Sequence, residues 1–329
     1  MKIERVVLIG GSGFVGSAVA NRLAETAVEV VVPTRHESRA RHLLLLPTVD
    51  VVEADVHDPA TLAHLVSGVD AVINLVGILH SRPGSPYGRD FARAHVELPQ
   101  KIVAACHAAR VPHLVHVSAL GASPDGPSEY LRSKAAGEAA VRAGGEAAVR
   151  AGGDAPAWTV LRPAVMFGRG DHFTNLFAKL ARRFPVLPLG GARARFQPVY
   201  VEDVASVICH CLRDPAAAGE TFELAGPRVY TLRELVEYIS DLAGAPRPII
   251  PLPEGLAMMQ AALMEWLPNP LMSRDNLRSM RVDNVASGAP LPFGMTPTPL
   301  EAVVPAYIGD SSQRARYYSM RSHSGRPHG

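Results

Sequence analysis

Cysteine is scarce in this chain, with three among its 329 residues: Cys106, Cys209 and Cys211. Three thiols exclude a scaffold built on disulfides, and their scarcity suits a reducing compartment. An excess of positive charge is also missing, since 33 Lys and Arg residues face 31 Asp and Glu residues. Proteins that bind nucleic acid usually carry a strong basic excess, so we predict no nucleic-acid partner.

Long apolar runs are missing as well. No stretch reaches the ~18 unbroken apolar residues of a membrane-spanning helix. The apolar run near the amino terminus ends in glycines, which is not typical of a secretion signal. We therefore expect a cytoplasmic location. The mean hydropathy of +0.09 is slightly high for a soluble monomer, and it leaves a partner protein or a peripheral contact with the inner face of the membrane as alternatives.

Short apolar runs instead alternate with helical stretches along the first half of the chain. The apolar runs cover residues 5–9, 28–32, 49–53, 71–76 and 113–118. The clearest helical stretch between them covers residues 89–110. Strands separated by helices predict a parallel sheet that is covered on both faces. The fold class that we predict is therefore α/β, with a doubly wound parallel sheet of Rossmann type.

The first apolar run leads directly into a glycine-rich turn. Residues 5–9 read RVVLI, residues 10–16 read GGSGFVG, and a helical stretch follows. This order is typical of dinucleotide binding, because glycines let the pyrophosphate approach the backbone and the helix amino terminus offers free N–H groups. The pattern fits a register that starts at Gly10 and one that starts at Gly11. The predicted contacts are Gly10, Gly11, Ser12, Gly13, Phe14, Val15 and Gly16.

The residues after the next strands bear on the choice of cofactor. An acidic residue at the end of the second strand would hydrogen-bond the ribose of NAD(H). The chain has Arg35 at this place, and a guanidinium can hold a 2′-phosphate with two hydrogen bonds. We therefore favour NADP(H) and keep NAD(H) as the alternative. Asp55 and Val56 follow the third strand and Gly77 follows the fourth, so we add them as cofactor contacts.

Candidate catalytic residues follow the fifth strand. Tyr130 and Lys134 are four residues apart, so on a helix they share one face. A nearby ammonium lowers the pKa of a phenol, and the pair could then move a proton beside a nicotinamide ring. Ser118 could hydrogen-bond a substrate carbonyl, with Ser128 as a substitute. In the alternative interpretation the pair is inactive and Lys134 only contacts the cofactor ribose.

Together these residues resemble the extended or atypical short-chain dehydrogenase/reductases. Further stretches resemble one family among them, the nucleotide-binding accessory subunit 9 of respiratory complex I and its bacterial relatives. These stretches are Tyr130–Glu138, Leu161–Asp171, Gln197–Val204 and Thr298–Glu301. The resemblance implies a Rossmann-type domain, a smaller carboxy-terminal α/β lobe, complex I as partner and an NADP(H) that is structural or regulatory. The alternative is a free NAD(P)-dependent reductase, epimerase or dehydratase that uses Tyr130 and Lys134.

We divide the chain into a nucleotide-binding core at 1–165, completed by later strands, a smaller lobe at 166–310 and a basic, disordered tail at 311–329. In the second half of the chain, Arg162, Arg169 and Asn175 are candidate substrate contacts, although Arg162 could equally pair with a carboxylate. The apolar stretch 249–272 fits a core helix or a surface that docks on a partner or membrane.

Two local patterns complete the prediction. The sequence GEAAVRAG at 137–144 is repeated unchanged at 145–152, which should lengthen the helix or loop after the Tyr130/Lys134 pair. Cys209, His210 and Cys211 have the residue types of a metal site. Consecutive side chains on a helix point about 100° apart, so we predict no metal there.

Overall fold

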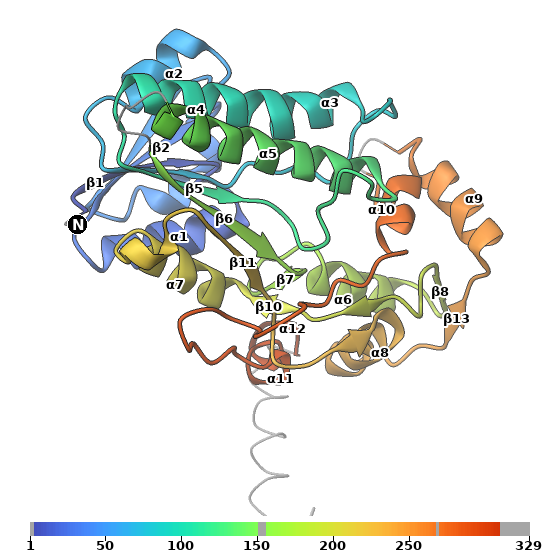
Figure 1. Cartoon of the computed structure of the whole chain (residues 1–329). Helices are drawn as coiled ribbons and strands as arrows, with labels where there is room; N and C mark the ends of the chain where they lie inside the picture. The colour runs from blue at the N-terminus through green and yellow to red at the C-terminus, as the bar shows by residue number, and fades with distance from the viewer. Residues whose placement is uncertain (1–2, 151–155, 268–269, 310–329) are drawn as a thin grey trace, which may run out of the picture.

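The computed structural model describes residues 3–150, 156–267 and 270–309, and a seven-stranded sheet forms its centre (Figure 1). The spatial order of the strands is β11-β6-β5-β4-β1-β2-β3, and all neighbouring pairs are parallel. The strands are β1 (Arg5–Ile9), β2 (Glu29–Thr34), β3 (Val49–Glu53), β4 (Ala71–Asn74), β5 (His113–Val117), β6 (Ala157–Pro163) and β11 (Glu220–Leu224). The predicted Rossmann-type fold class is confirmed.

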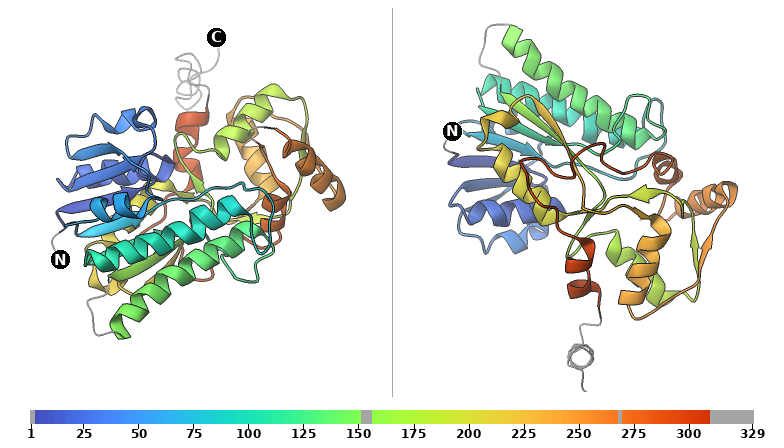
Figure 2. Two further views of the ribbon diagram at one scale, coloured as in Figure 1. Left: turned by 90° about the horizontal axis from the view of Figure 1, so that it is seen from above. Right: turned by 60° about the horizontal axis from the view of Figure 1, so that its bottom comes forward.

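Helices cover both faces of this sheet (Figures 1 and 2). One face carries α1 (Phe14–Ala24) and α7 (Val201–Cys211). The other face carries α2 (Pro59–Leu65), α4 (Leu98–Ala108) and α5 (Glu129–Arg150). Consecutive strand residues point to opposite faces. Because both faces are covered, the central strands β1, β4 and β5 are almost fully buried. The strand order reverses between β1 and β4.

The carboxy-terminal half adds a second apolar core beside the sheet. Helices α6 (Thr174–Arg183), α8 (Leu232–Leu242), α11 (Leu300–Val303) and α12 (Pro305–Ile308) contribute to this core. Helices α9 (Glu254–Met264) and α10 (Arg274–Ser279) pack on each other in a separate small cluster of the same half. Its short strands are β7 (Met166–Phe167), β8 (Leu187–Leu189), β9 (Arg195–Phe196), β10 (Val199–Tyr200), β12 (Tyr230–Thr231) and β13 (Ile249–Pro251). Thr231 and Glu234 form a reciprocal capping box at the start of α8. The tail that we predicted at 311–329 lies outside the described residues.

The predicted helix at 89–110 is divided into three parts. It begins as α3 (Arg89–Phe91), passes through a π-helical segment at Ala92–Glu97 and continues as α4. Gly137 on α5 faces the segment so closely that a Cβ there would lie 2.1 Å from the carbonyl oxygen of His95. Glycine is therefore required for α5 to reach this segment.

The first copy of the repeated sequence and the first six residues of the second lie within α5, and residues 151–152 are outside the described part of the chain. The helix continues without a break through Gly144 and Gly145 as far as Arg150. A Cβ on Gly144 would lie 2.1 Å from the Val103 side chain of α4. The repeat thus lies in a helix that packs against α4.

Two further properties concern membranes and metals. None of the helices within residues 3–150, 156–267 and 270–309 is long and apolar enough to cross a membrane. The same residues contain no group of three or more His, Cys, Asp and Glu side chains placed to hold a metal ion.

Cys209 and Cys211 are buried free thiols, and burial raises their pKa to about 11 and 12. The ring of His210 instead lies 3.1 Å from the carboxylate of Asp214.

Candidate nucleotide and proton-transfer site

The glycine turn lies at the carboxyl end of β1, where the strand order of the sheet reverses. Ligands of open parallel sheets bind at this position. Gly10 has a φ of +85° and turns the chain out of the strand. A Cβ on Gly16 would lie 2.4 Å from Gly11, so the turn closes against the first turn of α1. Gly10 thus makes the turn, and Gly11 packs against Gly16.

Helix α1 offers its amino terminus to this position. Gly13 is its N-cap and has no side chain that could accept a hydrogen bond from the first N–H groups. Ser12 precedes this cap, and Phe14 and Val15 begin the helix. The ring of Phe14 also lies under the loop after β7, because a Cβ on Gly168 would be 3.3 Å from it. Free N–H groups at a helix amino terminus suit a phosphate.

Arg35 directly follows the carboxyl end of β2. Its side chain is exposed and forms no ion pair with any described residue. The guanidinium is therefore available to a ligand at this edge of the sheet. Asp55 lies past the end of β3, where its carboxylate accepts a hydrogen bond from the N–H of His57 at 2.9 Å. Val56 is half-buried among the side chains under α2 and α4.

Lys134 extends from α5 to the carboxyl ends of β4 and β5. Its Nζ donates hydrogen bonds to the carbonyl oxygens of Val117 at 3.2 Å and Val76 at 3.5 Å. Burial lowers the pKa of this lysine to about 8, against the opposing effect of the Glu138 carboxylate. A Cβ on Gly77 would lie 3.2 Å from the Nζ atom. A side chain at position 77 would therefore press against the lysine and displace its ammonium slightly.

Tyr130 lies in the first turn of α5, one turn before Lys134. Its ring contacts the rings of Phe91 and His95 edge-on, at centroid distances of 6.1 and 5.6 Å. The phenol hydroxyl has no hydrogen-bond partner among the described residues. Burial raises the pKa of Tyr130 to about 12. We expected the lysine to lower this value, and that prediction was wrong for the chain alone, because burial is the dominant effect.

The two candidate serines have different surroundings. The Oγ atom of Ser118, at the end of β5, is buried and has no hydrogen-bond partner among the described residues. An unpaired buried hydroxyl is costly, so this atom is suited to a ligand. Ser128, the proposed substitute, is occupied: it accepts hydrogen bonds from the N–H of Leu131 and the hydroxyl of Ser279. Ser118 is therefore the candidate that the structure leaves free.

These features bear on the comparison with known proteins. Residues 6–225 match the NAD dependent epimerase/dehydratase family. The chain belongs to this family. Its fold is therefore that of an NAD(P)-binding domain. The closed glycine turn and the free Ser118 hydroxyl fit a nicotinamide dinucleotide.

Relatives of known name narrow the position of the chain within the epimerase/dehydratase family. The chain is 33% identical to NADH dehydrogenase [ubiquinone] 1 alpha subcomplex subunit 9 of Mus musculus, over 89% of this chain and 77% of that protein. Its identity to the Arabidopsis thaliana subunit is 32%, over 87% and 72% of the two chains. A ceramide reductase of Caulobacter vibrioides is 30% identical over 79% and 77%.

Solved structures of epimerases and dehydratases share the fold. A dTDP-glucose 4,6-dehydratase of Streptomyces venezuelae, solved with NAD and TYD bound, superposes with a TM-score of 0.69. It is 21% identical and the match covers 97% of this chain and 98% of that one. The epimerase Mth375 of Methanothermobacter thermautotrophicus has the same TM-score at 17% identity, over 98% and 94%. At these identities the likeness concerns the fold alone.

His95 is a residue of the candidate site to which the sequence pattern gave no role. Its Nε2 accepts a hydrogen bond from the N–H of Ile78 at 3.0 Å, directly after Gly77. The proton is then on Nδ1, which donates to the Oγ of Ser133 at 2.8 Å. Burial, and secondarily the charge of Lys134, lowers the pKa of His95 to about 2, so the ring stays neutral. A lone histidine in a helical stretch gave no signal of this role.

Most of the other residues of interest in the second half of the chain have structural partners. Arg162 pairs with the buried carboxylate of Glu138 at 2.6 Å, which is the structural alternative that we left open. Asn175 donates from its side-chain amide to the carbonyl of Asp171 at 3.1 Å. Asp203 accepts from the N–H and hydroxyl of Thr298. Arg169 is exposed in the loop that lies against Phe14. It is therefore the smaller-lobe candidate that the structure leaves near the glycine turn.

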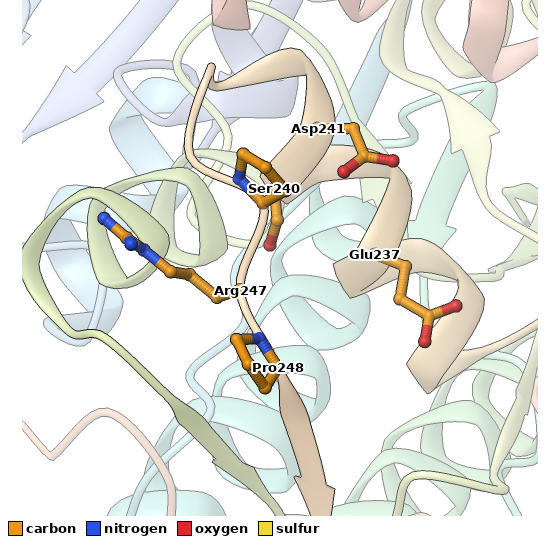
Figure 3. Close-up of a pocket in the computed structure, with 6 residues that line it drawn as sticks. Glu237, Ser240, Asp241, Arg247 and Pro248 are labelled. Atoms are coloured by element: carbon orange, nitrogen blue, oxygen red, sulfur yellow. The ribbon is translucent and has the colours of Figure 1, made fainter.

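A shallow cavity of about 410 Å³ lies outside this site, between α8 and β13 (Figure 3). Glu237 and Asp241 project from α8 at its edge, and Arg247 extends toward α6 (Figure 3). Glu237 pairs with Arg233, and Arg247 donates to the carbonyl of Ala181. The cavity contains none of the predicted site residues.

Proposed function

We propose that this chain binds NADP(H) where the strand order reverses and acts as a nucleotide-binding accessory protein of respiratory complex I, in which the nucleotide is held and not turned over. The main support for a nucleotide site here is the position of the Lys134 ammonium. It is held beside Gly77 at the carboxyl ends of two central strands. In the bound state the glycine turn and the amino terminus of α1 hold the pyrophosphate. Lys134 and Tyr130 contact the ribose and ring beside it.

Arg35 supports NADP(H) over NAD(H). Its exposed guanidinium lies past β2 and has no ion pair with a described residue. Two charge-assisted hydrogen bonds to a 2′-phosphate are worth about 1.5–3 kcal/mol or more. Arg35→Ala should therefore weaken NADPH binding at least about tenfold and leave NADH binding unchanged. Arg183→Ala, at another exposed arginine, is the control. An equal loss for both nucleotides would contradict the choice of NADP(H).

The partner is proposed from the relatives. Two relatives with identities of 32–33% over most of the chain carry names of complex I subunits. The corresponding location is the cytoplasmic side, at the inner face of the membrane. The test is a native gel of detergent-solubilised membranes, probed for this protein and stained for NADH dehydrogenase activity. Comigration supports the accessory role, and a protein found only in the soluble fraction contradicts it.

A free reductase, epimerase or dehydratase is the second candidate. It is favoured by two hydroxyls without partners among the described residues, Ser118 Oγ and Tyr130 Oη, and by a relative named ceramide reductase. In this reaction a bound nicotinamide would supply or accept the hydride. Ser118 and Tyr130 orient the substrate oxygen, Tyr130 exchanges a proton with it, and the Lys134 charge stabilises the resulting phenolate.

The Tyr130→Phe variant separates the two candidates. The substitution removes the proton donor and keeps the ring that packs on Phe91 and His95. An accessory protein should keep NADPH binding, comigration with the complex and its cellular function. A free enzyme should keep NADPH binding and lose that function. Loss of the cellular function with binding intact would therefore exclude the purely structural role.

A further inference from the structure

Two buried polar side chains, Asn74 and His116, lie side by side at the carboxyl ends of β4 and β5. Asn74 is 1% exposed and His116 is 2% exposed. The N–H of Val76 donates to Asn74 Oδ1 at 3.2 Å, so the oxygen of this amide faces Val76. The Nδ2 atom of Asn74 lies 3.1 Å from His116 Nδ1. An amide nitrogen can only donate, so Nδ1 of His116 is the acceptor.

This hydrogen bond fixes the position of the ring proton of His116. Burial, and secondarily the charge of Lys134, lowers the pKa of His116 to about 3, so the ring is neutral and carries one proton. Since Nδ1 accepts from Asn74, that proton is on Nε2. The Nε2 atom is buried and has no hydrogen-bond partner among the described residues. His116 thus presents a buried N–H donor from which no described residue accepts.

A carbonyl acceptor borders the same place as this donor. A Cβ on Gly137 of α5 would lie 2.1 Å from the carbonyl oxygen of His95 and 3.6 Å from His116 Nε2. The His95 carbonyl also lacks its usual helical donor, because the residue four positions on is Pro99, which has no N–H. The donor and the acceptor do not bond each other directly. They therefore face each other across the place that a side chain at position 137 would fill.

One water molecule satisfies both groups. A water accepts from an N–H and donates to a carbonyl over about 2.7–3.0 Å in each case. This reach suits two atoms that lie 2.1 and 3.6 Å from one common point beside Gly137. A buried donor without an acceptor is costly, and buried waters occur where buried polar groups lack other partners. The neutral, proton-bearing Nε2 atom and the carbonyl therefore indicate an internal water site.

The same two side chains support both acceptors of Lys134. The Nζ atom of Lys134 donates to the carbonyl oxygens of Val76 and Val117. Val76 is the residue whose N–H donates to Asn74. Val117 directly follows His116 on β5. A change in the Asn74–His116 pair therefore reaches the ammonium through both of the carbonyls that hold it.

We infer that one water molecule is bound inside the protein between the Nε2–H of His116 and the carbonyl oxygen of His95. With Asn74 and His116 this water forms a platform that positions the ammonium of Lys134. The water site uses only groups of the chain itself, so it goes beyond the proposed function and does not depend on it. The effect on nucleotide binding rests on the proposed NADP(H) site. Asn74 and His116 are positioning residues, since they act on a ligand through Lys134.

Measurements on the native full-length chain test the water site directly. A high-resolution crystal structure should show an ordered water within about 3.2 Å of both His116 Nε2 and the His95 carbonyl oxygen. Long-range proton–nitrogen NMR spectra of the chain with 15N-labelled histidine should show the ring proton of His116 on Nε2. Absence of the water overturns the inference, and so does a His116 ring that carries its proton on Nδ1. Neither measurement requires a variant to fold.

The His116→Phe variant tests the link to Lys134. It keeps a ring of similar size and removes the hydrogen bonds of the imidazole. The water should be lost, and the pKa of Lys134, about 8 in the native chain, should rise as the ammonium leaves its buried carbonyls. Carbon NMR of the lysine side chains follows this titration. NADPH affinity should fall several-fold.

His113→Phe is the matched control. His113 is buried on the opposite face of the same strand, where its ring bonds the hydroxyl of Thr159. This variant should keep the water, the titration of Lys134 and the native NADPH affinity. If both variants leave the Lys134 titration unchanged, or both shift it equally, the positioning of Lys134 is overturned. If the native chain does not bind NADPH, the proposed nucleotide function fails, and the water and the Lys134 titration still decide this inference.

Discussion

His95 offers the sharpest test of how the site is assembled. Its neutral ring connects the segment after β4, through the N–H of Ile78, to helix α5, through Ser133. The hydroxyl of Ser133 in turn donates to the carbonyl of Tyr130. The ring is 1% exposed and lies between Phe91 and Tyr130. It therefore holds the backbone beside the proposed nucleotide site and the first turn of α5 in one arrangement.

His95→Phe removes the hydrogen bonds and keeps the aromatic packing. The N–H of Ile78 loses its acceptor, and an unsatisfied buried donor costs about 1–3 kcal/mol. Ser133 keeps its bond to the Tyr130 carbonyl, so it adds little to this loss. We expect the free energy of unfolding to fall by about 2 kcal/mol. Because the segment at Gly77 lines the nucleotide site, NADPH affinity should also fall about tenfold.

The matched control is His113→Phe. His113 is buried on β5, and its ring hydrogen-bonds the hydroxyl of Thr159 at 2.9 Å, outside the candidate site. This variant should lose stability in urea unfolding but keep NADPH affinity, measured by titration of nucleotide fluorescence. Equal NADPH affinity of the His95 and His113 variants would refute the positioning role of His95.

Three further predictions follow from the same geometry. Gly77→Ala should weaken NADPH binding several-fold, because its methyl group would lie 3.2 Å from Lys134 Nζ; Gly288→Ala, which meets no atom within 4 Å, should not change it. Asp275→Ala should lower the free energy of unfolding by about 1–2 kcal/mol in urea titrations, because it uncaps α5; an unchanged value contradicts the cap. Lowering the pH from 6.5 to 5 should lower the free energy of unfolding, because the unfolded chain binds protons that the folded chain does not. Each buried neutral histidine contributes up to about 1.4 kcal/mol per pH unit to this loss. A urea midpoint of unfolding that stays constant over this pH range would contradict the prediction. These histidines, whose pKa burial lowers to about 2, 4 and 3, are His95, His113 and His116.

Local signals in the sequence were sufficient for the sheet and the glycine turn. Short apolar runs separated by helical stretches predicted β1 to β5 within a few residues of their bounds. The same holds for Tyr130 and Lys134, since two residues four positions apart on a helix lie on the same face. These features depend on neighbours in the chain, so the sequence contains them directly.

The smaller lobe was harder to predict. We weighed a core helix against a docking surface for the stretch 249–272, and its apolar composition fitted both. The structure places the alanines of α9 inside and the leucines outside, which no composition reveals. Periodicity shows that a helix has an apolar side, but burial depends on whether another element reaches that side.

By itself, the sequence determined the Rossmann-type fold, the position of the glycine turn and the candidates Ser118, Tyr130 and Lys134. Only the tertiary structure decided which of them are free and what holds them. Ser118 was left without a partner, Ser128 became part of a helix cap, and Asp275 reached α5 across 145 positions of sequence. The π-helical segment brought His95 to Ile78 in the same way. The physical reason is that burial and hydrogen-bond partners are set by residues that are distant in the chain and meet only when the sheet and the smaller lobe pack together.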